Sequence, residues 1–245
     1  YLKSAKKDFK IKYSINYLLV LAILGVGLIM YFTGGLKMSY ARLFTQIGFS
    51  IILAVSLNLV VGFLGELSLG HAGFMCIGAY IGGTAALALK SAIPNKLVVL
   101  ILAMLIGGIV AAVFGFIIGL PSLRLKGDYL AIVTLAFGEI VRNIFKNQKI
   151  FGGAMGLQTG AVQYDSRNRP TLYIVTLVVA LIMLVLIQNF IRSKHGRAVT
   201  AIRDNEIAAK AMGINVTFYK LFVFILAAFF AGIAGVIYSH YTATV

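Results

Sequence analysis

Ionisable and hydroxyl side chains stand close together in the stretch GELSLGHAGF, although the sequence around it is strongly apolar. Glu66, Ser68 and His71 fall within about two turns of a helix there. Charged groups at the depth of a bilayer are costly, so an apolar segment that contains them indicates function. We predict that these side chains line a path through a membrane or stabilise a broken helix. The alternative is that Glu66 lies at a cytoplasmic helix end and His71 makes an ordinary hydrogen bond between helices.

A second pair of charges interrupts a later apolar run. Glu139 and Arg142 have the i,i+3 spacing that places two side chains on one face of a helix, where they can neutralise each other. Two interpretations remain open. The pair is either a salt bridge in the interior of a bundle or a gate at the outer mouth of a path. Both residues therefore join Glu66, Ser68 and His71 as candidate path residues.

The sequence lacks the patterns that support metal binding or covalent catalysis. It contains three histidines, and its single cysteine, Cys76, cannot form a disulfide within the chain. The phosphate-binding pattern G-x-x-x-x-G-K-[ST] does not occur, so we expect no ATP to bind in that way. We therefore expect neither an enzyme, nor a metal site, nor a cofactor on this chain.

The elements that carry these residues are predicted to cross a membrane. The chain is 60% hydrophobic and 12% charged, whereas a soluble domain carries roughly 25% charged residues. A spanning helix needs about 20 apolar residues. Runs of about this length occur at 15–32, 43–63, 67–89, 97–120, 129–145, 171–191 and 218–241, seven in all. We predict an all-α, polytopic helical bundle that forms a single transmembrane domain over residues 1–245.

Two of these runs are less regular than the others. The run at 67–89 is rich in glycine, which suits either a tightly packed span or a broken, re-entrant one. The run at 129–145 is short and contains the two charges described above. Asp128 precedes it and is predicted to cap a helix that begins at Tyr129.

Basic residues indicate how the chain is oriented. They are more frequent in 1–14, 121–128 and 192–217 than in the connections between these segments, which favours a cytoplasmic N-terminus. The net charge of +15 follows from this rule, and no basic cluster alternates with aromatic residues as in a nucleic-acid site. The segment 146–170, rich in glycine and polar residues, is then an extracytoplasmic loop. It is either a plain connector or a docking or entrance element.

The cytoplasmic segment 192–217 contains the stretch HGRAVTAIRDNEIAAKAMGI, which is charged and favours helix. Asp204 and Asn205 are both good N-caps, and Glu206 follows in the first turn, where an acid is favoured. Glu206 and Lys210 have the spacing of an i,i+4 ion pair, and Gly213 is suited to end the helix. The pattern predicts two short helices joined by a sharp turn. Helices this short are not stable alone, so they must pack on something.

The stretch EIAAKAMG, 206–213, resembles the EAA loop of bacterial ABC importer permeases, in which a short coupling helix enters a groove on the ATPase. The longer stretch GRAVTAIRDNEIAAKAMGINVTFYKLFVFILAAFFAGIAGVIY looks like the same region of branched-chain amino-acid permeases of the LivM type. SLNLVVGFLGELSLGHAGFMCIGAYIGG, 56–83, and RLKGDYLAIVTLAFGEIVRNI, 124–144, agree with it in the same order. Two features depart from the general EAA pattern: Ile207 follows the acid directly, and no proline follows Gly213. Both suit the Liv-type branch.

The resemblance implies a permease subunit that translocates leucine, isoleucine or valine across the bacterial inner membrane. Its implied partners are a second permease subunit, two cytoplasmic ATPases that bind ATP and magnesium, an extracytoplasmic substrate-binding protein and membrane lipid. The residues that it assigns to ATPase coupling are Arg203, Asp204, Glu206, Ala208, Ala209, Lys210 and Gly213. It also implies further membrane helices after about residue 241. The same branch includes permeases for urea, short amides and other amino acids, and an ATPase-independent transporter or channel, or a membrane scaffold, is the remaining alternative.

Overall fold

A computed structural model describes residues 22, 25, 26, 29, 38–122, 125, 127–159, 169–242 and 245. All the elements within these residues are helical, as the composition predicts. The long helices are α2 (Met38–Asn58), α3 (His71–Lys90), α4 (Lys96–Ser122), α5 (Asp128–Asn147), α6 (Arg169–Arg192) and α9 (Val216–Tyr241). The short ones are α7 (Lys194–Asp204), α8 (Glu206–Ala211), the π-helix η1 (Leu59–Leu64) and the 3-10 helices η2 (Lys149–Phe151) and η3 (Gly153–Met155).

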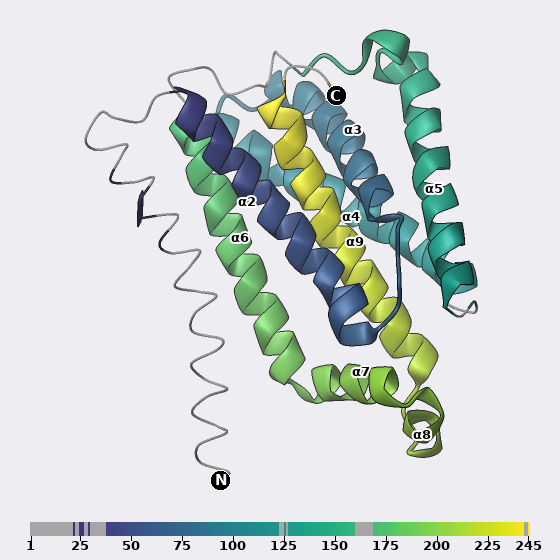
Figure 1. The fold of residues 1–245 in the computed structure, drawn as a ribbon. Helices are drawn as coiled ribbons and strands as arrows, with labels where there is room; N and C mark the ends of the chain where they lie inside the picture. The colour runs from purple at the N-terminus through teal and green to yellow at the C-terminus, as the bar shows by residue number, and fades with distance from the viewer. Residues whose placement is uncertain are drawn as a thin grey trace.

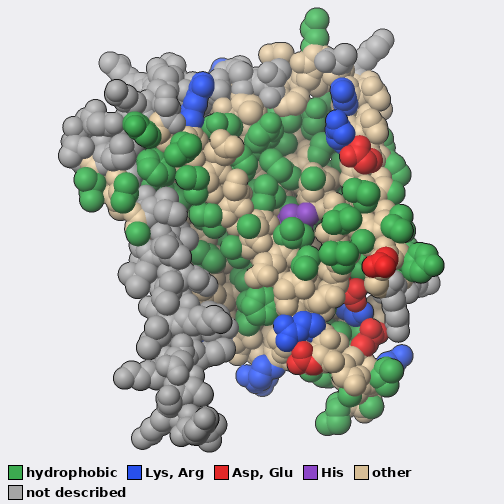
Figure 2. All heavy atoms as spheres, viewed as in Figure 1, with side chains coloured by type: hydrophobic (Ala, Val, Ile, Leu, Met, Phe, Trp, Pro, Cys, Tyr) green, Lys and Arg blue, Asp and Glu red, His purple; other side chains and the backbone are tan. Residues whose placement is uncertain are grey.

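Helices α2, α3, α4, α6 and α9 are long and apolar enough to cross a membrane, which agrees with five of the predicted runs. Apolar side chains cover most of the face in Figure 2, and charged ones gather toward its two ends. Helix α5 forms where the run at 129–145 predicts it, but charged residues keep it from meeting the same criterion. It still extends between the two ends of the bundle beside α3 (Figure 1). The predicted run at 15–32 lies outside the described residues.

Helix α9 runs through the middle of the bundle and contacts α2, α3, α4 and α6 (Figure 1). Glycines bring it against α3 at backbone distance. A Cβ on Gly235 would overlap the carbonyl oxygen of Met75, and a Cβ on Gly78 would overlap that of Gly232. Small residues that let backbones approach are a common means of packing helices in lipid, where apolar burial alone drives little association.

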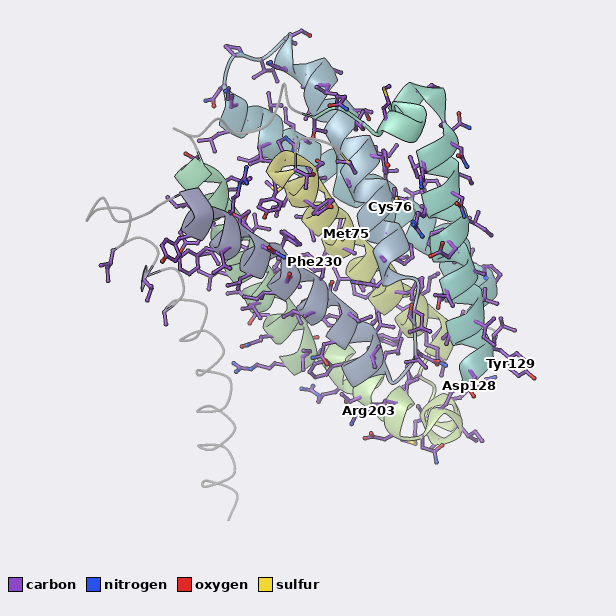
Figure 3. All side chains as sticks on the ribbon, turned by 45° about the horizontal axis from the view of Figure 1, so that its top comes forward. Met75, Cys76, Asp128, Tyr129, Arg203 and Phe230 are labelled. Atoms are coloured by element: carbon purple, nitrogen blue, oxygen red, sulfur yellow. The ribbon has the colours of Figure 1, made fainter. Side chains whose placement is uncertain are left out.

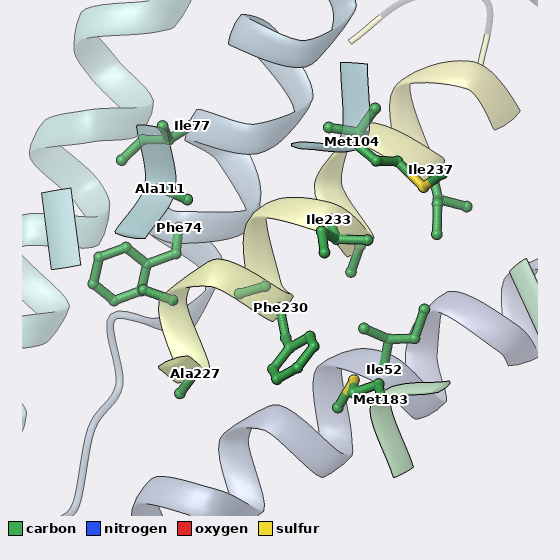
Figure 4. Packing of buried hydrophobic residues seen from close by; sticks show 14 of the residues in the cluster. Ile52, Phe74, Ile77, Met104, Ala111, Met183, Ala227, Phe230, Ile233 and Ile237 are labelled. Atoms are coloured by element: carbon green, nitrogen blue, oxygen red, sulfur yellow. The ribbon is translucent and has the colours of Figure 1, made fainter. Parts of the chain in front are cut away.

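Large side chains from α9 and from the four helices around it form the apolar core (Figure 4). They include Ile52 from α2, Phe74 and Ile77 from α3, Met104 from α4, Met183 from α6, and Phe230, Ile233 and Ile237 from α9. The apolar core and the glycine contacts together make α9 the element on which the other helices are arranged.

The chain is interrupted between α2 and α3, as the glycine-rich run allowed. Helix α2 ends in η1, Gly65 adopts the left-handed conformation with φ +80°, and residues 65–70 are not helical. The helix predicted from residue 67 therefore begins at His71. Figure 1 shows 65–70 returning from the lower end of α2 toward the middle of the bundle, where α3 begins. We call residues 65–70 the break.

The two polar segments lie at opposite ends of the bundle (Figure 1). Helices α7 and α8 lie at the lower end, and η2 and η3 at the upper end. This agrees with the predicted opposite sides for 192–217 and 146–170, while the assignment of one end to the cytoplasm stays a prediction. The loop predicted at 146–170 is partly ordered, because α5 continues to Asn147 and η2, η3 follow it. Residues 160–168 lie outside the described part.

The capping role predicted for Asp128 is wrong. Helix α5 begins at Asp128 itself, Gly127 occupies the capping position with φ +58°, and no side chain caps the helix there. Asp128 lies in the first turn, where the helix dipole favours a carboxylate.

We expect Gly235→Ala to destabilise the bundle, because the added methyl would overlap the backbone of Met75. Forcing volume into a packed core costs about 1–3 kcal/mol. The loss should appear as a lower apparent Tm of the detergent-solubilised protein, measured by size-exclusion chromatography after heating. Gly138→Ala is the matched control, because a Cβ there makes only ordinary contacts, the nearest at 3.7 Å. Equal melting of the two variants would contradict the packing described here.

Candidate coupling and translocation site

Three charged side chains from distant parts of the sequence meet at the lower end of the bundle. Lys220 on α9 donates hydrogen bonds to Oε1 of Glu66 and, at 3.1 Å, to Oε2 of Glu206. The Lys220 side chain is 6% exposed, that of Glu66 14% and that of Glu206 38%. We call these three residues the ion triad. Because its cation is buried, each carboxylate is needed to offset the cost of removing the ammonium group from water.

Local sequence signals place each member of the triad. Gly65 ends η1 in the left-handed conformation, so Glu66 is the next residue of the break. Asn205 caps α8 by accepting a hydrogen bond of 3.0 Å from the backbone N–H of Ala208, so Glu206 begins the helix. The cap at Asn205, rather than Asp204, settles the alternative that the sequence left open. Lys220 lies in the second turn of α9, which Asn215 caps in the same way.

Helix α7 is attached to the same region through Arg203. Its guanidinium donates a hydrogen bond of 3.0 Å to the carbonyl oxygen of Gly62 in η1, and a second group of bonds reaches the carboxylate of Asp204. The stem of Arg203 packs on Gly65, where a Cβ would come within 2.6 Å of its Cγ. Arg203 therefore links α7 to the end of α2, and Asp204 helps to orient it (Figure 3).

The two short helices form the predicted helix–turn–helix and pack on the start of α9. Ile202, Ala209 and Val216 make a small buried cluster between them. Gly213 has φ +82°, as its predicted place at the helix end requires. The predicted pairing of Glu206 with Lys210 is wrong, because Glu206 turns inward to Lys220 and Lys210 is exposed. Glu206 pairs with Lys220 rather than Lys210, because a buried ammonium group must be offset by a carboxylate while an exposed one is solvated by water.

The outer face of α8 is apolar and exposed. Ile207 is 81% exposed and Met212 82%, and Ala208 beside them is also exposed. Ile207 is the residue that departs from the general EAA pattern. Its side chain projects away from the core of this chain and is accessible for contact with another protein.

The upper end of the break is held between α2 and α5. His71 and Ser56 share a hydrogen bond of 2.7 Å between Nε2 and Oγ, which links the start of α3 to α2. The backbone N–H of Leu69 donates to Oγ1 of Thr134 on α5 at 3.0 Å. A Cβ on Gly70 would overlap the carbonyl oxygen of Thr134. Ser68, in the same segment, is buried. The candidate path residues Glu66, Ser68 and His71 thus lie along one interruption of the bundle.

Glu139 and Arg142 form their predicted ion pair, at 3.2 Å, but not in the interior of this chain. Their side chains are 56% and 64% exposed, respectively. They lie on the wall of a cavity of about 360 Å³ between α3 and α5. The structure therefore separates the candidate path residues into two groups, one in the break and one on this wall.

No group of three or more His, Cys, Asp or Glu among the described residues could hold a metal ion. Lys220 and Arg203 at the lower end are matched by the carboxylates of Glu66, Glu206 and Asp204 and by the carbonyl oxygen of Gly62. These contacts link the break, α8 and α9. The cavity between α3 and α5 offers room for a small molecule.

Sequence reasoning missed Lys220 and Gly62 as functional positions. Lys220 could have been predicted to need a partner, because it is a lone basic residue near the start of a long apolar run, where an unpaired charge is costly. Its two partners could not be predicted from the sequence, since Glu66 lies 154 positions away and Glu206 lies 14 positions away.

Comparison with known proteins agrees with this arrangement. Residues 39–245 match the family described as the permease component of branched-chain amino acid transport systems. The chain belongs to this family. Over 221 residues it is 36% identical to the high-affinity branched-chain amino acid transport system permease protein LivM of Salmonella typhimurium and to that of Escherichia coli. Each alignment covers 77% of this permease and 49% of the relative, so the chain spans about half the length of both.

A more distant relative is the probable branched-chain amino acid transport permease protein LivM of Methanocaldococcus jannaschii. It is 29% identical over 229 residues, which cover 81% of this permease and 66% of the relative. No solved structure matches the chain significantly. The family resemblance drawn from 56–83, 124–144 and 196–238 is therefore confirmed.

Lys220→Met should destabilise this permease strongly, because Glu66 and Glu206 would be left close together without a cation. Removing one partner of a buried ion pair costs about 3–5 kcal/mol. The measurement is the apparent Tm in detergent. Lys210→Met, at an exposed position of α8, is the control and should leave the Tm unchanged.

Combining Lys220→Met with Glu66→Gln should recover part of the loss, because one stranded carboxylate is removed. A double variant that is no more stable than Lys220→Met alone would show that the two groups are not coupled.

Proposed function

We propose that this chain is a membrane-spanning permease subunit of an ABC importer, and that it translocates branched-chain amino acids across the bacterial inner membrane. The observation that carries the proposal is the ion triad, which ties a projecting helix, α8, to an interruption inside the membrane bundle. Family membership and the names of the relatives support the transport role. The chain itself performs no covalent chemistry in this proposal.

The proposed partners follow from the surfaces that this chain leaves exposed. Helix α8 presents Ile207 and Met212, which suit the groove of a cytoplasmic ATPase, with an equivalent contact on a second permease subunit and a second ATPase. ATP and magnesium bind to those ATPases. An extracytoplasmic binding protein delivers the substrate at the end that carries η2 and η3. The end that carries α7 and α8 is then cytoplasmic, and so is the N-terminus.

The proposed mechanism is alternating access driven through α8. Closure of the ATPase pair on ATP moves α8 and, with it, Glu206. Lys220 transfers this displacement to α9 and Glu66 transfers it to the break, while Arg203 moves the end of α2 through Gly62. ATP can favour one state only through contacts that differ between the two states, and the contact at α8 is where that difference enters this subunit.

Ile207→Asp should weaken assembly with the ATPase, because it places a charge on a highly exposed apolar position of α8. Loss of a central apolar contact should lower the amount of ATPase retained on the purified permease on the order of tenfold. The permease is expressed with its genomic neighbours for this measurement. Ile150→Asp is the control, because Ile150 is equally exposed, at 80%, but lies at the opposite end.

Equal retention in the two variants would remove α8 from the ATPase interface. If the unaltered permease retains no ATPase at all, the importer assignment itself fails, and an ATPase-independent transporter or channel takes its place.

Glu206→Lys should uncouple the transporter, because it replaces an attraction to Lys220 by a repulsion. The variant should insert into the membrane normally. Substrate uptake into proteoliposomes should be lost, and so should the stimulation of ATP hydrolysis by the permease. Uptake assays on the reconstituted complex measure this, with Lys90→Glu, an exposed charge reversal at the end of α3, as the control. Unchanged transport in Glu206→Lys would contradict the coupling role. A ligand screen on the partner binding protein distinguishes leucine, isoleucine and valine from urea, short amides and other amino acids.

A further inference from the structure

The ion pair of Glu139 and Arg142 lies on α5 and borders a cavity. Both side chains are more than half exposed on α5, which extends between the two ends of a membrane bundle. Charges within a membrane face a bundle interior or a water-filled space. This side of α5 therefore borders water or another protein in the membrane, and the pair is accessible to a solute there.

The cavity beside this pair combines two kinds of wall. Glu139 and Arg142 supply one anion and one cation from α5. The remaining wall is mostly apolar and includes Leu69 from the break, Ala72, Met75 and Ala79 from α3, and Leu135 from α5. Cys76 also lines the cavity and lies between α3 and α5 in Figure 3. A volume of about 360 Å³ falls in the range of about 300–1,000 Å³ that is typical of small-molecule pockets.

We propose that this cavity is a transit site for one zwitterionic α-amino acid with an aliphatic side chain. Arg142 binds the carboxylate, Glu139 binds the ammonium group, and the apolar wall receives the side chain. The inference rests on the proposed importer function and deepens it, because it assigns the substrate class to residues of this chain.

The charges match this ligand for a physical reason. The two charged groups of an α-amino acid are joined through one carbon atom, so they can meet a cation and an anion that are themselves 3.2 Å apart. The existing ion pair is exposed and therefore weak, and the ligand replaces it with two charge-assisted hydrogen bonds. A neutral solute such as urea cannot replace the pair in this way, and a simple anion or cation leaves one of the two residues unmatched. The site therefore favours zwitterions.

The proposed site is connected to the ion triad through the break. Leu69 lines the cavity, and Glu66, three residues earlier, belongs to the triad. A movement of the lower end of the break therefore displaces part of the cavity wall. The site is placed where ATP-driven movement can change its affinity.

Cys76 allows occupancy to be measured directly, because it is the single cysteine of the chain. The probe is N-ethylmaleimide, applied to the complete reconstituted complex whose other subunits carry no cysteine, with labelling followed by mass spectrometry. Leucine should slow the labelling of Cys76 by about threefold or more when it fills most of the site. Leucine amide and 4-methylpentanoate, which each lack one of the two charges, should give much less protection.

Transport by charge variants gives a second, independent measurement. Arg142→Gln and Glu139→Gln should each lower leucine uptake on the order of tenfold, the loss of one charge-assisted hydrogen bond. ATP hydrolysis stimulated by the loaded binding protein should persist. Lys146→Gln is the matched control, because it removes a charge one turn further along α5, outside the cavity. The double variant Arg142→Gln with Glu139→Gln should transport no better than either single variant.

Two results would overturn the proposal. One is normal uptake in both single variants. The other is a double variant that transports better than the single variants, which is the behaviour of a structural ion pair whose removal leaves no unmatched charge. If Cys76 does not react with the probe, these transport results decide alone. Failure of the importer function appears differently, as a complex without ATP-driven uptake in the unaltered protein, so the two failures are distinguishable.

Discussion

The buried ammonium group of Lys220 is the constraint on which the lower half of this permease depends. A buried cation must be matched by anions, and the two that match it come from the break and from α8. The requirement therefore brings three segments to one point, although 154 positions separate Lys220 from Glu66 and 14 separate it from Glu206. Breaking the contact with Glu66 leaves a buried carboxylate without its cation. The triad is for that reason a linkage that resists separation while allowing its members to move together.

The packing of α9 decides how far such a movement is carried. Gly78 on α3 and Gly235 on α9 bring the two helices so close that backbone atoms replace side chains at the contact. Interfaces of this kind do not deform continuously, so adjacent helices shift as units. In the proposed mechanism, a displacement at Lys220 would reach α3 by direct contact, in addition to the route through the break. The apolar core around Phe230 and Ile237 stabilises this central helix.

The features that could be predicted from the sequence are those that local interactions decide. The cap at Asp204 or Asn205 and the turn at Gly213 depend on residues within a few positions of each other, and so do the apolar runs. The predicted cap at Asp128 was wrong because Gly127 takes the capping position. The predicted pairing of Lys210 with Glu206 was wrong because Glu206 pairs with Lys220. The ion pair of Lys220 with Glu66 and the hydrogen bond of Arg203 to the carbonyl of Gly62 could not be predicted, because each joins residues that only the folded bundle brings together.

The break contributes residues to both the ion triad and the cavity, and the hydrogen bonds of its backbone explain how a non-helical segment is tolerated there. Polypeptide without helical hydrogen bonds is tolerated at membrane depth only where other groups satisfy it or where it borders water. Here Glu66 N–H donates to the carbonyl of Val60 and Leu69 N–H to the hydroxyl of Thr134, so its two ends are satisfied by different helices. A segment held by α2 at one end and by α5 at the other must change shape when these helices separate. Its side chains reach the ion triad below and the cavity above, so one change of shape alters both.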